Sequence, residues 1–246
     1  MKIISIGEPI EHPNVSLEYY SSSVSLLDYD ILIWNPSDLF LEYEQDYVRP
    51  KFQGKRCLKE DSSFKIIEDI KRRNNEIREM INLGRIVVII MPPSESCFYY
   101  TGEKQYSGTG RSRVTSNIVT PLEITAAIPI RDFKSISAEG TCIECRSEEH
   151  FKRYWRKAEK IHPQYSAYLS SEIGKPFLFI KGTRRVVGTW IPQEKGFYLM
   201  LPSIVQLNQF KTKKAYREAC SIFIDALLDL ISGLKKTSGD YLLPEW

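Results

Sequence analysis

Histidine and cysteine are scarce in this sequence, and long apolar runs are missing from it. The 246 residues include 3 histidines and 5 cysteines. No run approaches the roughly 18 apolar residues that a membrane-spanning helix needs, so we predict no membrane partner. The number of cysteines is odd and no secretion signal precedes the first predicted strand. Both features favour a reducing, cytoplasmic location over a disulfide framework.

Neither sign of charge dominates the composition. The chain has 34 basic and 31 acidic residues, a net charge of +3, which is too even a balance to identify a nucleic-acid-binding protein by itself. The hydrophobic content of 42% and charged content of 26% are those of an ordinary globular protein. The length suits one α/β domain over residues 1–246, with an irregular β-rich insertion at about 94–130.

The segment from residue 64 to residue 93 organises the predicted fold. A three-four spacing of apolar residues indicates one stripe on a helix that ends at Gly84; the stripe consists of Ile67, Ile70, Ile77 and Ile81. The period then changes, because residues 85–91 form a continuous, mostly β-branched run that Pro92 and Pro93 close. Such a run is typical of a strand covered on both faces at the centre of a parallel sheet. We therefore predict a βαβ arrangement and an α/β fold.

Shorter segments complete the predicted structure. Further strands are expected at residues 2–6, 15–20, 31–34, 97–100 and 114–119, and an antiparallel meander at 177–180, 185–190 and 197–201. Helices are expected at 148–161 and 215–234. We interpret residues 101–113, which are rich in glycine and basic side chains, as a flexible loop that leaves the sheet.

The order of these elements resembles the class I glutamine amidotransferase-like superfamily. The resemblance rests on the strand at 30–34, on the helix that runs through Leu83-Gly84-Arg85 into the strand at 86–91, and on the late strand at 196–202. It covers about two thirds of the chain. It implies a flavodoxin-like three-layer α/β sandwich with a mainly parallel central sheet.

The resemblance does not extend to the catalytic residues of that superfamily. Its catalytic members carry a cysteine in a Gly-x-Cys-x-Gly elbow directly after the strand equivalent to residues 85–91, where a sharp turn exposes the thiol beside backbone N–H groups. This sequence has Pro92-Pro93-Ser94 there, and proline has no N–H to donate. We therefore predict that the fold is retained and that the amidotransferase reaction is lost.

Three residues are candidates for a relocated catalytic site. Cys97 follows the central strand closely, and His150 or His162 could serve as its base. The simpler interpretation is that Cys97 is a small buried residue of a strand, because a single cysteine without a recognisable base is weak evidence for a nucleophile.

Two further cysteines suggest a metal site. Cys142 and Cys145, with the same two histidines downstream, supply four soft ligands that zinc accepts. Their spacing differs from that of a standard zinc finger, so we interpret them as ordinary strand or loop cysteines and predict no cofactor.

The loop at 108–113 is the most suggestive local segment. Gly108 and Gly110 would let backbone N–H groups converge on an anion, and Arg111 and Arg113 could clamp a phosphate. The loop has no Gly-Lys-Ser/Thr sequence, so it is not a P-loop. A solvated hairpin tip is the alternative interpretation.

Other charged groups are consistent with a solvent-exposed surface as well as with a binding site. Three basic clusters could contact nucleic acid or lie on exposed helix faces: the pair Arg72-Arg73, the segment 211–214 and the segment 152–157. In the last of these, charged residues alternate with aromatic rings. Four carboxylates lie around the third strand without a spacing that demands a metal or an acid/base pair: Asp28, Asp30, Asp38 and Glu42.

The function predicted from these observations is that of a non-catalytic protein that binds a ligand or a protein partner at the carboxyl edge of its parallel strands. The site is expected near Asn35, Pro92, Pro93 and Ser94, because open α/β sheets bind their ligands at that edge. The alternatives are a hydrolase with an unrecognised nucleophile or metal site, and a nucleic-acid-associated module that uses the 108–113 loop. A phosphorylated ligand or nucleic acid is the partner that the loop would take.

Overall fold

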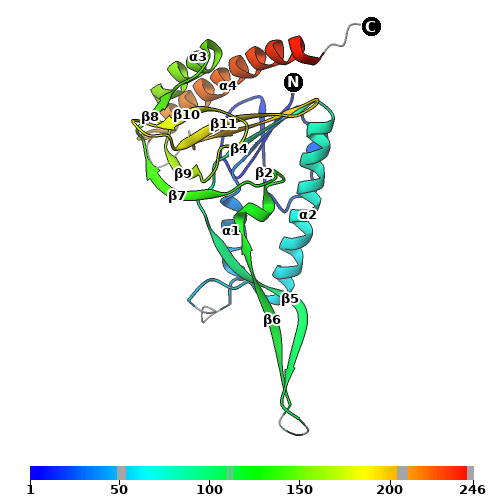
Figure 1. Ribbon diagram of the computed structural model, residues 1–246. Helices are drawn as coiled ribbons and strands as arrows, with labels where there is room; N and C mark the ends of the chain where they lie inside the picture. Colours follow the sequence, from blue (N-terminus) through cyan, green and yellow to red (C-terminus); the bar gives the residue numbers. More distant parts are fainter. Residues whose placement is uncertain (49–53, 110, 112, 204–209, 243–246) are drawn as a thin grey trace.

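The computed structural model describes residues 1–48, 54–109, 111, 113–203 and 210–242. Its main element is an eight-stranded sheet with the strand order β2-β1-β3-β4-β12-β11-β10-β8 (Figure 1). The strands are β1 (Ile3–Ile6), β2 (Val15–Glu18), β3 (Ile31–Trp34), β4 (Ile86–Ile90), β8 (Ile143–Cys145), β10 (Lys175–Ile180), β11 (Val186–Pro192) and β12 (Phe197–Leu201).

The sheet is parallel in one half and antiparallel in the other. β1 pairs in parallel with β2 and β3, and β4 pairs in parallel with β3 and β12. The pairs β12 with β11, β11 with β10 and β10 with β8 are antiparallel. The α/β class with a mainly parallel central sheet is therefore confirmed, and so is the meander of β10, β11 and β12.

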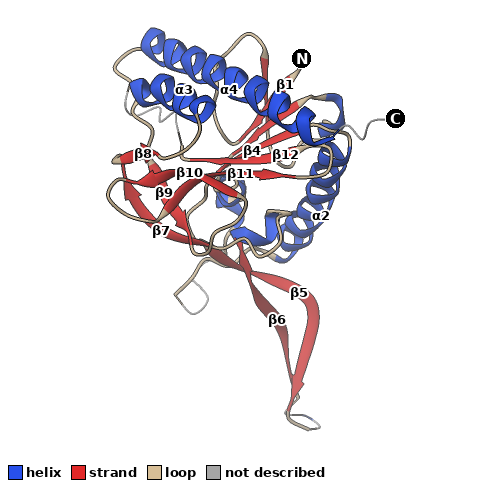
Figure 2. Cartoon of the chain, turned by 45° about the horizontal axis from the view of Figure 1, so that its top comes forward, coloured by secondary structure: helices blue, strands red, loops and turns tan. Residues whose placement is uncertain are grey.

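Helices cover both faces of the sheet (Figure 2). α3 (Glu149–Ala158) and α4 (Lys213–Leu242) pack on one face, and α2 (Glu60–Asn82) with the short α1 (Asp38–Glu42) packs on the other. Successive residues of β4 alternate between the two cores: Ile86 and Val88 join the α3/α4 core, whereas Val87 and Ile89 join the α2 core. The prediction of a central strand covered on both faces is confirmed.

The helix that feeds β4 ends at the predicted glycine. Gly84 has φ +76°, a left-handed conformation that glycine adopts without steric cost. Its N–H donates to the carbonyl of Ile81 at 3.0 Å, and the N–H of Arg85 donates to the carbonyl of Met80 at 2.9 Å. These bonds satisfy carbonyl groups at the helix end and turn the chain directly into β4.

The insertion forms a long β-ribbon. β5 (Ser96–Ser107) and β6 (Val114–Glu123) pair in antiparallel and extend well beyond the rest of the fold (Figure 1). The predicted antiparallel excursion is present as this ribbon, but the prediction of a loop over residues 101–113 was wrong for 101–107. That segment continues β5, because its residues find strand partners such as Asn117 for Lys104 and Thr115 for Tyr106.

Several short elements have no counterpart among the sequence predictions. β7 (Ser135–Gly140) and β9 (Tyr165–Leu169) pair in a second small sheet. Within the described residues, short 3₁₀ helices include η1 (Leu26–Asp28), η2 (Glu44–Asp46) and η4 (Ile124–Ala127), whereas η5 (Glu159–Ile161) is the end of the helix expected at 148–161. In β7 only Ser135 is buried, and the one large apolar residue, Ile136, is exposed, so its sequence carries little of the apolar alternation that indicates a strand.

Candidate functional site at the edge of the sheet

A buried carboxylate lies where three strands of the sheet end. Glu8 follows β1, Asn35 follows β3, and Ser203 follows β12. Asn35 Nδ2 donates to Glu8 Oε2 at 2.9 Å, and Ser203 Oγ donates to Glu8 Oε1 at 3.3 Å. Glu8 is only 3% exposed, so these bonds offset the cost of removing its carboxylate from water. The carboxylate thereby ties together the ends of the strands at this edge.

A cavity of about 360 Å³ adjoins this carboxylate. The ends of β1 and β2 and the segments that follow β1, β2 and β3 contribute its walls: Ser5, Gly7, Glu8, Pro9, Leu17, Glu18, Tyr19 and Asp38. Three of these residues carry carboxyl groups and none carries a cation. Leu17 is 50% exposed and Tyr19 69% exposed, so the cavity combines an acidic wall with apolar surface open to solvent.

Gly7 brings the segments after β1 and β3 into contact. It has φ +74°, and a Cβ atom on residue 7 would lie 2.7 Å from the carbonyl oxygen of Asn35 and would also collide with Asp38 Cβ. The glycine therefore serves both the turn after β1 and the close approach of α1. Because of that approach, the side chain of Asp38 reaches the cavity.

The charge of Asp38 is disfavoured in this position. Burial raises the pKa of Asp38 above its ordinary value, and the negative charge of Glu42 raises it further. Glu42 is fixed by the backbone N–H groups of Tyr20 and Ser21, which donate to its two carboxylate oxygens at 2.9 and 3.0 Å. A cation in the cavity would lower the energy of the ionised Asp38, whereas an anion would raise it.

The other half of the predicted edge site is covered by the chain itself. Ser166 Oγ of β9 donates to the carbonyl of Met91 at 3.1 Å, and the backbone N–H of Ser94 donates to Ser137 Oγ of β7 at 2.9 Å. Pro92 is buried and Pro93 half-buried beneath these strands. Asn35 thus supports the cavity through Glu8, while Pro92, Pro93 and Ser94 lie outside its lining.

The candidate catalytic residues lie apart from one another. Cys97 is buried in the core on the α2 face, and burial raises the pKa of its thiol to about 11. The ring of His150 lies 4.2 Å, centroid to centroid, from the tilted ring of Phe151, which belongs to the core on the opposite face of the sheet. His162 follows η5 in a left-handed conformation, with φ +52°. The fold therefore places Cys97 and His150 on opposite sides of the sheet.

The candidate metal ligands lie at the antiparallel end of the sheet. Cys142 is exposed before β8, and Cys145 is half-buried on β8 with a pKa that burial raises to about 11. Within the part of the chain that the structure describes, no three or more His, Cys, Asp or Glu side chains gather closely enough to hold a metal ion.

The candidate anion-binding loop lies at the far end of the β-ribbon, away from the sheet edge (Figure 1). Gly108, Arg111 and Arg113 are exposed there, and Gly110 lies outside the described residues. The guanidinium of Arg113 lies 4.2 Å from the centroid of the Tyr106 ring. The two groups of predicted ligand-binding residues therefore belong to separate places on the molecule.

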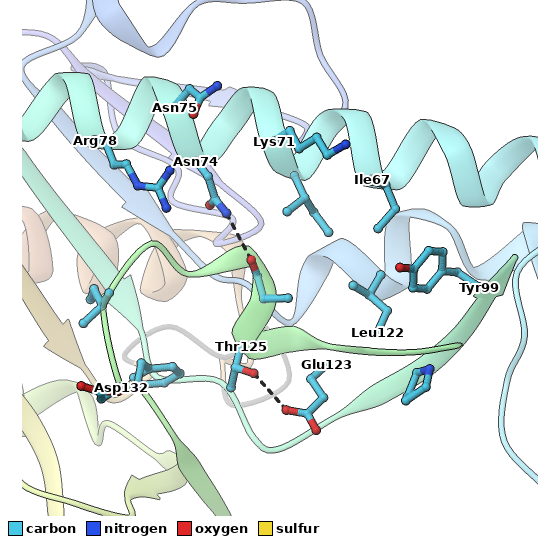
Figure 3. A pocket seen from close by; sticks show the side chains of 15 residues that line it. Ile67, Lys71, Asn74, Asn75, Arg78, Tyr99, Leu122, Glu123, Thr125 and Asp132 are labelled. Atoms are coloured by element: carbon cyan, nitrogen blue, oxygen red, sulfur yellow. Dashed lines mark hydrogen bonds between the residues drawn. The ribbon is translucent and has the colours of Figure 1, made fainter. Parts of the chain in front are cut away.

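A larger cavity of about 790 Å³ separates α2 from the base of the ribbon (Figure 3). Its lining mixes both signs of charge, with Lys71 and Arg78 on α2 facing a wall that includes Glu123 and Asp132. Asn74 Nδ2 donates to the carbonyl of Ala126 at 3.1 Å across it. We interpret this cavity as part of the contact region between the ribbon and the rest of the fold.

The acidic wall of the edge cavity was missed by the sequence analysis. The signal was present in Gly7-Glu8-Pro9, an abrupt exit from the first strand, and in Asp38 after the third. What the sequence did not show is that both carboxyl groups, with Glu18 from β2, surround one cavity.

Comparison of the chain with protein-family models, with curated proteins and with solved structures found no match. Across the described residues, no helix has the length and apolar character required to cross a bilayer.

Proposed function

We propose that this protein binds a small, positively charged ligand at the carboxyl edge of its parallel strands and does not catalyse a reaction on it. The observation that carries the proposal is the cavity walled by Glu8, Glu18 and Asp38. An amine or guanidinium group would lie against the carboxyl groups of Glu18 and Asp38, and an apolar portion of the ligand would contact Leu17 and Tyr19.

The strand order supports this location. Numbered along the chain, the five parallel strands run 2-1-3-4-5 across the sheet, which is the flavodoxin-like order. In that order the chain reverses direction across the sheet beside β1, and ligands of open α/β sheets bind outside the strand ends at such a reversal. Glu8 and Asn35, which follow β1 and β3, meet at this point. We accordingly propose a flavodoxin-like sandwich of the glutamine amidotransferase-like kind.

The absence of catalysis is inferred from the segment after β4. Residues 91–95 connect β4 to β5, a strand, whereas a nucleophile elbow needs a strand that turns into a helix. Pro92 and Pro93 provide no N–H groups that could stabilise an oxyanion there.

The electrostatics of Asp38 support a cationic ligand over an anionic one. The unliganded site holds Asp38 in an environment that disfavours its charge, through burial and through Glu42. A bound cation would interact favourably with the ionised carboxylate of Asp38. The ligand should therefore bind most tightly when Asp38 has lost its proton. Binding should therefore weaken as the pH falls and Asp38 becomes protonated.

The test is a thermal-shift measurement with agmatine, which carries a guanidinium and an amine, and with 4-guanidinobutanoate, in which a carboxylate replaces the amine. At a concentration tenfold above Kd, a specific cationic ligand should raise Tm by about 3 °C or more. The rise should be smaller with 4-guanidinobutanoate, whose carboxylate the acidic wall repels, and absent with inorganic phosphate.

The variants Asp38→Asn and Glu18→Gln should abolish the agmatine effect, whereas Glu172→Gln, which changes an exposed carboxylate elsewhere, should leave it intact. Equal stabilisation by agmatine and phosphate, or a full agmatine effect in Asp38→Asn, would contradict the proposal. No effect of agmatine or of spermidine on the wild-type protein would contradict it as well.

A further inference from the structure

The distal half of the β5–β6 ribbon is a separate surface with its own chemistry. From Gly102 to Thr109 and from Arg113 to Asn117, every residue is exposed. Both figures show this half of the ribbon extending away from the sheet and helices (Figures 1 and 2). An isolated two-stranded ribbon is at best marginally stable in water, so such an extension is typical of a segment that contacts a partner.

The pairing register separates the side chains of the ribbon into two faces. Lys104 pairs with Asn117 and Tyr106 with Thr115, so these four side chains share one face. Arg113 lies on the same face, two residues before Thr115, and its guanidinium covers the Tyr106 ring at 4.2 Å. We call these five residues the basic face.

The paired residues of the opposite face are neutral. It carries Gln105 paired with Ser116 and Ser107 paired with Val114. Glu103, the acidic residue of this part of the ribbon, lies in the irregular segment between Tyr100 and Lys104, where the pairing register shifts. The positive charges of Lys104 and Arg113 are gathered on one face.

The base of the ribbon holds this face in a fixed position. The backbone N–H of Tyr100 donates to Ser63 Oγ of α2 at 3.0 Å. Gly102 lies so close to Phe64 that a Cβ atom on residue 102 would be 2.9 Å from its ring. Leu122 and Ile124, at the other side of the base, are buried. The ribbon is thus anchored where it leaves the fold and exposed beyond that point.

We propose that the basic face of the β5–β6 ribbon binds duplex DNA by lying in the major groove. A major groove about 12 Å wide admits a two-stranded β-ribbon. Lys104 and Arg113 would contact phosphates or base edges, and the amide of Asn117 and the hydroxyl of Thr115 offer hydrogen-bonding groups between them. The basic face thus presents positive charge and polar groups in the pattern that a duplex accepts.

Two other forms of nucleic acid fit the ribbon less well. The major groove of duplex RNA is deep and narrow, so a ribbon cannot lie in it. Single strands are commonly held by bases stacked on aromatic rings, but the guanidinium of Arg113 already covers one face of the Tyr106 ring. Both are included in the test because their phosphate chemistry is the same.

The experiment measures binding of a fluorescein-labelled 24-base-pair DNA duplex of mixed sequence by anisotropy, at KCl concentrations from 50 to 200 mM. The variant K104A/R113A removes both charges of the basic face, and K160A/R184A removes two exposed charges from the body as a matched control. Each lost phosphate contact lowers the slope of log K against log salt by about 1. The basic-face variant should therefore lose about two units of slope and bind at least about tenfold more weakly at 50 mM KCl, with the control unchanged.

Several outcomes would overturn the proposal. One is a wild-type protein that leaves the duplex unbound at 50 mM KCl, and another is an equal loss in both double variants. Tighter binding of single-stranded DNA or duplex RNA than of duplex DNA would exclude the groove assignment. Light scattering supplies the last check: if K104A/R113A converts a dimer into a monomer, the ribbon belongs to an interface between two copies of this chain. Failure of this test leaves the edge cavity unaffected, because the ribbon contributes no residue to it.

Discussion

The Nε atom of Arg73 donates a hydrogen bond of 2.9 Å to the carbonyl oxygen of Tyr20. The guanidinium is fully buried between α2 and residues 20–24, where it also donates to the carbonyls of Val24 and Ser22 at 2.8 Å. Glu76, one turn along the helix, accepts at 2.7 Å. One side chain thus fixes the conformation of the connection between β2 and η1. The sequence interpretation of Arg73 as part of a surface basic cluster was wrong.

Replacing Arg73 should destabilise the protein strongly. Arg73→Ala leaves Glu76 without its partner and removes the donor to the carbonyls of Ser22 and Val24, which should lower the free energy of unfolding by about 3–5 kcal/mol. Arg72→Ala is the matched control, because the Arg72 side chain is 34% exposed and its ion pair with Asp69 should contribute about 1 kcal/mol or less. Urea unfolding of the two variants measures the difference. Similar losses in both would contradict the structural role assigned to Arg73.

Removing the charge of Asp38 should stabilise the unliganded protein. The pKa of Asp38 is raised on folding, chiefly by burial, so ionisation opposes folding above the folded-state pKa. Below the unfolded-state pKa both states hold the proton and the penalty disappears. Asp38→Asn should therefore raise Tm at pH 7, and this gain should vanish as the pH falls to about 3.

The control for this experiment is Asp28→Asn, which changes an exposed aspartate in η1 and should leave Tm unchanged at both pH values. A gain in Tm for Asp38→Asn that persists at low pH would mean that the charge of Asp38 is not its cause.

The thiols should differ sharply in reactivity. Cys142 is exposed, whereas Cys57, Cys97 and Cys220 are buried and burial raises the pKa of each. Since the thiolate is the reactive form, iodoacetamide at pH 8 should modify Cys142 first and reach the three buried thiols only on unfolding. Peptide mass spectrometry over a time course measures the order. Preferential modification of Cys97 in the native protein would instead favour the hydrolase alternative.

The sequence predicted the elements whose apolar pattern is set by the core. Residues 86–90 are apolar at every position because both faces of β4 are covered, and Gly84 marks the helix end because its φ is positive. These features can be recognised from the periodicity of neighbouring residues or from a single residue. The class of fold follows from them.

The site and the ribbon depend on contacts between distant segments, which no local period records. Glu8, Glu18 and Asp38 meet only because β1, β2 and β3 lie side by side in parallel register. The exposed half of the ribbon has no apolar alternation, since neither of its faces is buried, so its polar residues were interpreted as a loop. Arg73 is a polar residue of α2 that is buried by residues 20–24, which lie much earlier in the sequence.

The pairing of β4 with β12 has a consequence for synthesis of the chain. Ile86 is aligned with Phe197, so a nascent chain carries β4 with one unpaired edge throughout the production of the ribbon, the small second sheet and most of the meander. An apolar strand with an open edge is a template for intermolecular pairing. Chains truncated before residue 197 should accordingly aggregate after their release from the ribosome. Slow translation of the segment between β4 and β12 should increase the demand for chaperones.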